Sequence, residues 1–159
     1  MVEIYTDGAA SGNPGPGGLG VVMLFNGHRK EHSEGFRYTT NNRMELLAVI
    51  RALEMMKTTA HPIHIYSDSA YVINSITKGW LFGWLKTGFK GKKNKDLWLR
   101  YAAIAPKFNI TFHWVKGHAS NKENNRCDEL AVAARKVKGL PVDPGFVKAE
   151  KPSKKRKPL

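Results

Sequence analysis

Two short segments of the chain, residues 4–8 and 65–69, have almost the same sequence, IYTDG and IYSDS. In each, an alternating apolar run leads directly to an aspartate, Asp7 or Asp68. Such alternation predicts a half-buried strand, so each aspartate is expected at a strand end. If the two strands are parallel neighbours, both carboxylates leave the sheet at the same edge, where open α/β sheets bind their ligands.

The rest of the chain predicts an α/β fold with a mixed sheet. Three consecutive strands come first, and strands then alternate with helices, which is typical of a sheet with helices packed on it. The stretch 8–20 is rich in Gly and Pro and is expected to be a turn-rich loop. The expected strands are residues 2–6, 21–25, 29–38, 63–67 and 109–115, and the expected helices follow Asn41, Ser69, Lys95 and Lys122.

The length and the net charge of the chain limit the functions that it can have. The 159 residues fit one domain, residues 1–140, followed by a basic, Pro- and Lys-rich tail, residues 141–159, that we expect to be mobile. The net charge of +13 implies a polyanionic partner, most often nucleic acid. No run is long enough to span a bilayer, no signal peptide is recognisable, and Cys127 is the single cysteine. We therefore expect a cytoplasmic, reducing location with no membrane partner, and a buried Cys127.

Two further acids join Asp7 and Asp68. Glu45 lies in the early turns of the first expected helix, and Asp128 in those of the last. Taken singly, each acid has an ordinary explanation, a turn at a strand end or a carboxylate near a helix N-terminus. Four such acids in so basic a chain instead indicate a metal site.

Oxygen ligands alone suit Mg²⁺ or Mn²⁺ rather than Zn²⁺. Two such ions about 3.5–4 Å apart bind both the attacking water and the leaving oxygen of a phosphodiester. We therefore predict two Mg²⁺ ions, with Mn²⁺ as the alternative, held by Asp7, Glu45, Asp68 and Asp128. His118, in the loop before the last helix, is suited to move a proton beside them, although a lone loop histidine is often only a solvated side chain.

These residues lie in motifs that resemble the bacterial-type (type 1) ribonuclease H family. The motifs are YTDGAASGNPGPGG, TTNNRMEL, YSDSAYV, KNKDLWLR and WVKGHASNKENNRCDELA, in this order. The resemblance implies a ribonuclease H-like fold, a five-stranded mixed sheet with helices on both faces. It also implies endonucleolytic cleavage of the RNA strand in RNA–DNA hybrids, leaving 5′-phosphate and 3′-hydroxyl ends. The four acids would be the metal ligands, and His118 the proton shuttle or an aid to product release.

The resemblance also assigns residues that bind the hybrid. Asn13, Asn41 and Asn42 would read the minor groove, where the 2′-OH distinguishes RNA from DNA. Turn formation at Asn13 and helix capping at Asn41 remain alternatives. Thr40 would hold a DNA phosphate, and Ser69 remains beside Asp68, although Ala70 stands where many members carry Gln. The basic protrusion would grip the DNA strand through Trp80, Lys86, Lys90, Lys92 and Lys93.

Two other functions stay open at this point. A hybrid-binding protein without catalysis would have no chemical need for all four acids and His118. An integrase-type enzyme acting on DNA shares the superfold, which by itself cannot decide the substrate. We expect a monomer, because no heptad or apolar interface stripe is present. Residues 148–159 carry six basic residues and one acid, a net charge of +5, and are expected to tether the chain to nucleic acid at low salt.

Overall fold

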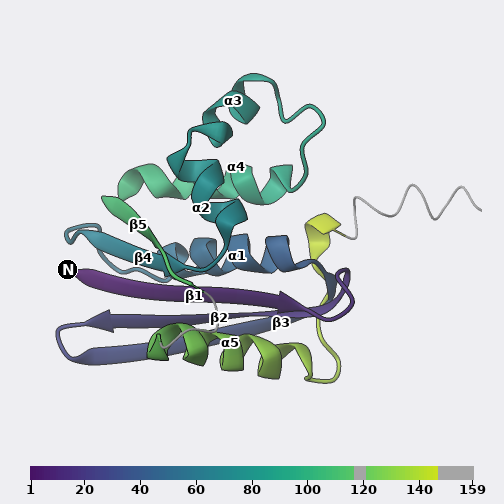
Figure 1. The fold of residues 1–159 in the computed structure, drawn as a ribbon, viewed down its shortest axis with the longest axis horizontal. Helices are drawn as coiled ribbons and strands as arrows, with labels where there is room; N and C mark the ends of the chain where they lie inside the picture. The colour runs from purple at the N-terminus through teal and green to yellow at the C-terminus, as the bar shows by residue number, and fades with distance from the viewer. Residues whose placement is uncertain (117–120, 147–159) are drawn as a thin grey trace, which may run out of the picture.

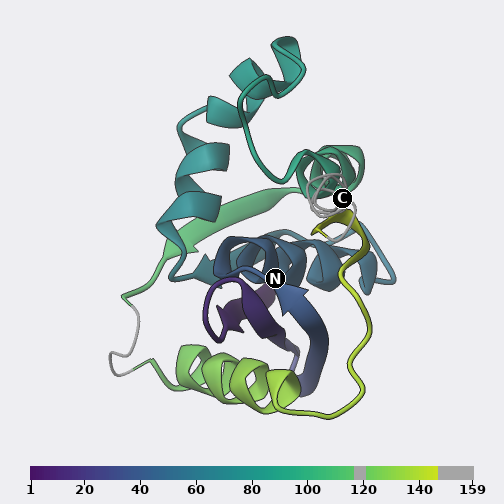
Figure 2. The same ribbon diagram turned by 90° about the vertical axis from the view of Figure 1, so that its right-hand side faces the viewer.

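The computed structural model describes residues 1–116 and 121–146, which form a five-stranded sheet with helices on both faces (Figures 1 and 2). The strand order is β3-β2-β1-β4-β5, antiparallel among β1–β3 and parallel from β1 through β4 to β5. The predicted mixed sheet is confirmed. In chain order the elements are β1 (Val2–Ala10), β2 (Gly15–Phe25), β3 (His28–Thr39), α1 (Asn41–Glu54), β4 (Ile63–Ser67), α2 (Ala70–Thr77), α3 (Trp80–Lys86), α4 (Lys95–Ile104), a 3₁₀ turn (Ala105–Lys107), β5 (Ile110–Trp114) and α5 (Lys122–Arg135).

The two largest helices lie on opposite faces of the sheet. Helix α1 packs on β1 and β2 and carries α4 on its outer side, while α5 covers β1, β2 and β3 from the other side (Figure 2). The core between α1 and the sheet contains fully buried Ile4, Val21, Leu46, Ile50 and Ile65. No helix within the described residues is long and apolar enough to cross a membrane.

The expected loop at residues 8–20 is mostly wrong. Strand β1 continues past Asp7 to Ala10, and β2 already begins at Gly15, with Asp7 paired to Gly20 across the two strands. The glycines that suggest a loop are there because a helix lies against them. A Cβ atom at Gly18 would collide with the Ala131 carbonyl of α5, and one at Gly20 with the Cys127 carbonyl.

This contact gives a prediction for stability. Gly20→Ala should lower the free energy of unfolding by about 1–3 kcal/mol, since the added methyl group overpacks the interface between β2 and α5. Gly83→Ala is the matched control, because its Cβ atom meets no neighbour and α3 would gain up to about 1 kcal/mol. Urea unfolding of both variants measures the difference. Equal stabilities would contradict the close approach of α5.

The first part of the predicted tail is held by contacts to the domain. Residues 141–146 pack against the domain, whereas residues 147–159 lie outside the described residues. Asp143 is 3 % exposed, accepts a hydrogen bond from Thr39 Oγ1 at 2.7 Å, and forms an ion pair with Arg43 Nε at 2.7 Å. The Pro141 carbonyl accepts a backbone hydrogen bond at 2.9 Å from Arg37. A single buried acid therefore fastens a stretch whose composition indicates mobility.

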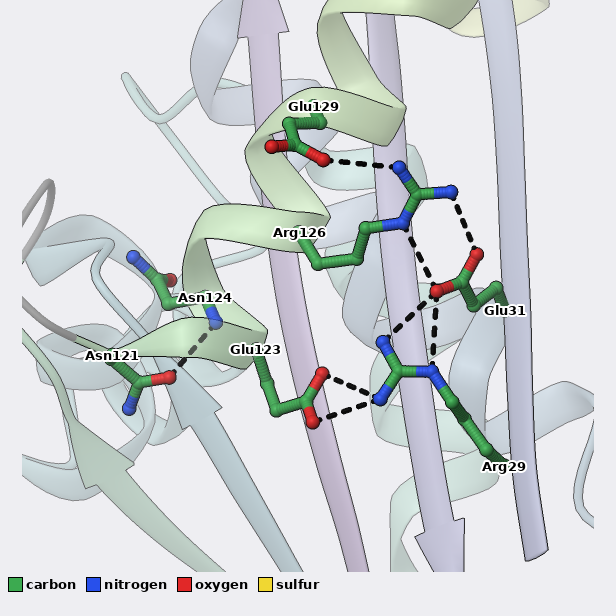
Figure 3. Close-up of polar contacts among 7 residues, drawn as sticks. All are labelled: Arg29, Glu31, Asn121, Glu123, Asn124, Arg126 and Glu129. Atoms are coloured by element: carbon green, nitrogen blue, oxygen red, sulfur yellow. Dashed lines mark hydrogen bonds and ion pairs between the residues drawn. The ribbon is translucent and has the colours of Figure 1, made fainter.

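Helix α5 is fastened to β3 by a chain of ion pairs (Figure 3). Glu31 of β3 accepts from Arg29 and from Arg126, both at 2.9 Å. Arg29 also pairs with Glu123 at 2.8 Å, and Arg126 with Glu129 at 3.0 Å. Such exposed pairs stabilise a protein only slightly. This set nevertheless joins Glu123 and Arg126, in the first turns of α5, to strand β3. It therefore helps to set the position of the helix that carries Asp128.

Helix α3 and the loop that follows it stand away from the sheet (Figures 1 and 2). Lys86, Lys90, Lys92 and Lys93 of this segment are all exposed. Other parts of the segment are not exposed, because Leu81 and Phe89 are buried. Trp98 is fully buried beneath it, and half-buried Trp84 packs edge-on against Trp98, with the ring centroids 5.9 Å apart. The protrusion is therefore an exposed basic surface on an aromatic base.

Candidate metal centre and nucleic-acid interface

The parallel pairing of β1 and β4 brings Asp7 and Asp68 together. Their ladder ends at the pair Thr6–Ser67, so the two aspartates occupy the next position of each strand. Asp7 remains paired with β2, while the chain after Asp68 turns into α2, with Ser69 as the N-cap that accepts from Val72 N at 3.1 Å. The repeated sequence thus places two carboxylates at one edge of the sheet, as the pattern predicts.

Helix α1 supplies the third carboxylate. Its N-cap is Thr40, whose hydroxyl accepts from Arg43 N at 3.2 Å, so Glu45 follows in the second turn. Gly8 allows the approach, because a Cβ atom there would collide with the backbone at Met44 and Glu45. Carboxylate oxygens of Asp7, Glu45 and Asp68 lie within 4.8 Å of one another. Three acids far apart in sequence therefore meet at one point.

The cluster has unsatisfied oxygens and perturbed acidities. Glu45 Oε1 and Asp68 Oδ1 are buried and have no hydrogen-bond partner among the described residues. Burial, and then the charge of Asp68, raises the pKa of Asp7 to about 8. Burial, and then the charge of Asp7, raises the pKa of Glu45 well above its usual value. Like charges held this close out of water need a cation, and orphaned carboxylate oxygens are the ligands that hard cations prefer.

The raised pKa of Asp7 predicts how stability depends on pH without metal. The folded state keeps a proton on Asp7 up to about pH 8, whereas the unfolded chain releases it near 3.8. Stability should therefore fall as the pH rises from about 4 to 8, by more than about 1.4 kcal/mol, the equivalent of one pKa unit. Urea unfolding in chelator at pH 5, 6.5 and 8 measures this slope.

Asp7→Asn is the control for that measurement, because it removes the titrating carboxylate without changing the other ionisable side chains. The variant should show a flatter pH profile and gain less stability from Mg²⁺ at pH 8 than the wild-type chain. A wild-type profile that is flat in chelator would show that the carboxylates do not repel one another.

Asp128 lies in the wall of the same depression. It projects from α5 into an open hollow of about 460 Å³ that Asp7, Glu45 and Asp68 also line. Its oxygens are not part of the group within 4.8 Å. The structure therefore brings oxygens of three of the four predicted ligands within 4.8 Å of one another, with the fourth nearby on a separate element. The predicted fifth residue, His118, lies outside the described residues.

Three other predicted residues line this acidic depression, namely Asn41, Asn42 and Ser69. Ala70 lines it too. Asn41 does not cap α1; its Oδ1 accepts from Ala10 N at 2.5 Å, and its own N–H donates to Asn13 Oδ1 at 2.9 Å. Asn13 and Asn41 thus join the end of β1, the following turn and the start of α1, while Asn42 is exposed.

A second hollow of about 680 Å³ adjoins the first at Asn42. Among its lining residues are four more predicted binding residues, Asn13, Thr40, Lys92 and Lys93. We call this the basic depression. The structure does not bring Trp80, Lys86 or Lys90 to either hollow. Trp80 is 46 % exposed on the protrusion, with the Lys78 ammonium 5.7 Å from the centre of its ring.

Sequence reasoning missed the ion pairs beneath the basic depression. The side chain of Arg43 is buried and bonds both Asp96 and Asp143, each at 2.7 Å. These two acids hold the pKa of the Arg43 guanidinium above its usual value, even though burial lowers it. A signal existed in the sequence, because Arg43 shares a helix face with Leu46, Leu47 and Ile50, and a charge on an apolar face requires partners.

The chain is similar to known proteins over most of its length. The sequence profile described as RNase H matches residues 1–136. A protein of Desulforamulus reducens named Ribonuclease H is 55 % identical over 147 residues, covering 89 % of this chain and 92 % of the relative. The crystal structure of LC9-RNase H1, a type 1 RNase H with the type 2 active-site motif, superimposes with a TM-score of 0.75 and 30 % identity, covering 94 % and 80 % of the two chains.

LC11-RNase H1, solved in complex with an RNA/DNA hybrid, has a TM-score of 0.62 and 31 % identity, covering 84 % of this chain and 96 % of that one.

Proposed function

Because this chain belongs to the ribonuclease H family and cleaves the RNA strand of RNA–DNA hybrids, we propose that it does so with two Mg²⁺ ions held by Asp7, Glu45, Asp68 and Asp128. The observation that carries the proposal is the cluster of three carboxylates, two of whose buried oxygens have no partner in residues 1–116 and 121–146. Mn²⁺ is the alternative ion, since it prefers the same oxygen ligands. When bound, the cations supply charge that polarises the scissile phosphate and acidifies the attacking water.

The protein's own residues orient the reaction. Asp7 and Asp68 are held by two paired strands and Glu45 by a capped helix, so the carboxylates need little rearrangement to bind cations. Asp128 approaches from α5 on the other side of the sheet. His118 is proposed to move the proton that leaves the attacking water, or to help the product depart, leaving 5′-phosphate and 3′-hydroxyl ends.

The two adjoining hollows suggest how a hybrid binds. An RNA strand in the acidic depression and a DNA strand in the basic depression would set the minor groove over Asn13, Asn41 and Asn42. Amide groups at that position can contact the 2′-OH, which only the RNA strand carries. Thr40 and the exposed lysines would bind phosphates of the DNA strand. Hybrid binding by LC11-RNase H1 supports this arrangement.

Electron paramagnetic resonance with Mn²⁺ tests the number of ions. Frozen enzyme mixed rapidly with hybrid and Mn²⁺ should give the signal of two spin-coupled ions. Glu45→Gln should reduce that signal to isolated ions, whereas Glu54→Gln, which changes an acid at the other end of α1, should not. Isolated Mn²⁺ in the wild-type complex, with full cleavage activity, would contradict a two-ion site.

Charge removal in the basic depression should weaken binding without slowing chemistry. The double variant of Lys92→Ala and Lys93→Ala is expected to raise KM and to lower the slope of log KM against log salt by about 0.9 for each lost phosphate contact. Lys57→Ala is the control, because Lys57 is equally exposed but lines neither hollow. Kinetics between 50 and 200 mM salt measure the slope. A fall in kcat with unchanged KM would contradict the assignment.

A further inference from the structure

Arg135 shares the acidic depression with the four carboxylates. It is the last residue of α5 and lies seven positions, about two helical turns, after Asp128, so both face the same side of the helix. Among the described residues it is the one Lys or Arg that lines this hollow. Ala9 and Ala10, at the end of β1, line the hollow with it. A positive charge therefore stands in the wall of a site that is otherwise neutral or acidic.

Arg135 has no partner among the described residues. Arg29, Arg43, Arg51, Arg100 and Arg126 each pair with a carboxylate. Arg37 donates to the Leu140 carbonyl at 3.0 Å. Of the arginines in residues 1–116 and 121–146, only Arg135 makes neither kind of contact. It is nevertheless half-buried, and Asp128 is on the same helix. No described residue therefore uses its five N–H donors, which are available to a ligand.

The chemistry of the ligand follows from the surroundings. The four carboxylates repel a polyanion wherever cations do not cover them, so the strand needs another anchor as it leaves the metal centre. A guanidinium binds a phosphate through two parallel hydrogen bonds, and it keeps its charge at any working pH. Lys92 and Lys93 cannot serve, because they line the basic depression and not the acidic one.

We propose that Arg135 binds a non-scissile phosphate of the RNA strand and so sets the position of that strand over the carboxylates. This inference rests on the proposed function of the acidic depression. It adds a substrate-binding residue on α5, beyond Ser69 and the segments 13–42 and 80–93 from which the sequence predicts contacts to the hybrid.

The test uses a hybrid with one cleavable site, four ribonucleotides within a DNA strand, carrying single neutral methylphosphonates at successive flanking positions. For the unmodified hybrid, Arg135→Ala should raise KM about tenfold and leave kcat within about twofold. In the wild-type enzyme, one flanking methylphosphonate should raise KM by a similar factor. In Arg135→Ala that same methylphosphonate should have no further effect, because the contact is already lost.

Two controls make the result specific. Lys136→Ala removes an exposed charge from the next residue, which lines neither hollow, and should behave as wild type. Arg135→Lys should recover part of the loss in KM, since a single ammonium keeps the charge but not the paired hydrogen bonds. Thermal unfolding of each variant checks that α5 is intact.

Two outcomes would overturn the inference. If every methylphosphonate raises KM equally in Arg135→Ala and wild type, Arg135 contacts no phosphate. If Arg135→Ala lowers the Mg²⁺ concentration needed for half-maximal rate and leaves KM unchanged, the arginine only offsets the charge of the acids. Failure of the proposed function would look different, because Asp7→Asn would then retain activity.

Discussion

Asp7→Asn is expected to reduce cleavage of an RNA–DNA hybrid by at least about a thousandfold while the chain remains folded. Asp7 lies in the three-acid cluster and is 5 % exposed at the point where β1 separates from β4. Stabilisation of the developing charge by a bound cation is worth several kcal/mol, and each 1.36 kcal/mol is a factor of ten in rate. Single-turnover cleavage in Mg²⁺ measures the loss.

Glu3→Gln is the matched control for that variant. Glu3 is on the same strand, one position from buried Val2 and Ile4, but it lies at the other end of the sheet from the cluster and is half-exposed. It should retain wild-type rates, and both variants should unfold cooperatively. Near-normal cleavage by Asp7→Asn would remove the basis for a metal centre at this position.

The second large effect concerns stability. Asp143→Ala should lower the free energy of unfolding by about 3 kcal/mol. Removing one partner of a buried ion pair costs about 3–5 kcal/mol, and Asp96 remains to bond Arg43, which places the effect at the lower end. Thr39 Oγ1 also loses its hydrogen bond to Asp143. Urea unfolding at neutral pH measures the difference.

A chain that ends at residue 146 separates this anchor from the charged tail. It keeps Asp143 and should be as stable as the full chain. It lacks all six basic residues of the tail, so its KM for the hybrid should rise at low salt and match the full chain at high salt. The anchor would be misassigned if the chain that ends at residue 146 were less stable than the full chain while the Asp143→Ala variant kept full stability.

Periodicity and short repeated sequences predicted the order of strands and helices and the position of the acids. Asp7 and Asp68 were predictable because identical local patterns on parallel neighbours end at the same level. Ser69 was predictable as an N-cap because its hydroxyl lies between a short strand and a helical stretch. These features depend on residues close together in sequence.

What the sequence did not reveal depends on contacts between distant segments. Gly18 and Gly20 resemble loop residues until α5, more than 100 residues later, is placed against them. Asp143 resembles part of a mobile tail in the sequence, because only the fold shows that it pairs with buried Arg43. Arg135 resembles an ordinary helix-terminal cation, because only the fold places it in the hollow of Asp7.

The most direct test of the metal centre is a cleavage assay on three labelled duplexes, an RNA–DNA hybrid, a double-stranded RNA and a double-stranded DNA. Each is incubated with the wild-type chain in Mg²⁺ and again with chelator. We predict cleavage of the RNA strand in the hybrid alone, lost with chelator and restored by added Mg²⁺. Cleavage of the hybrid that persists in chelator would contradict a function based on Asp7, Glu45, Asp68 and Asp128.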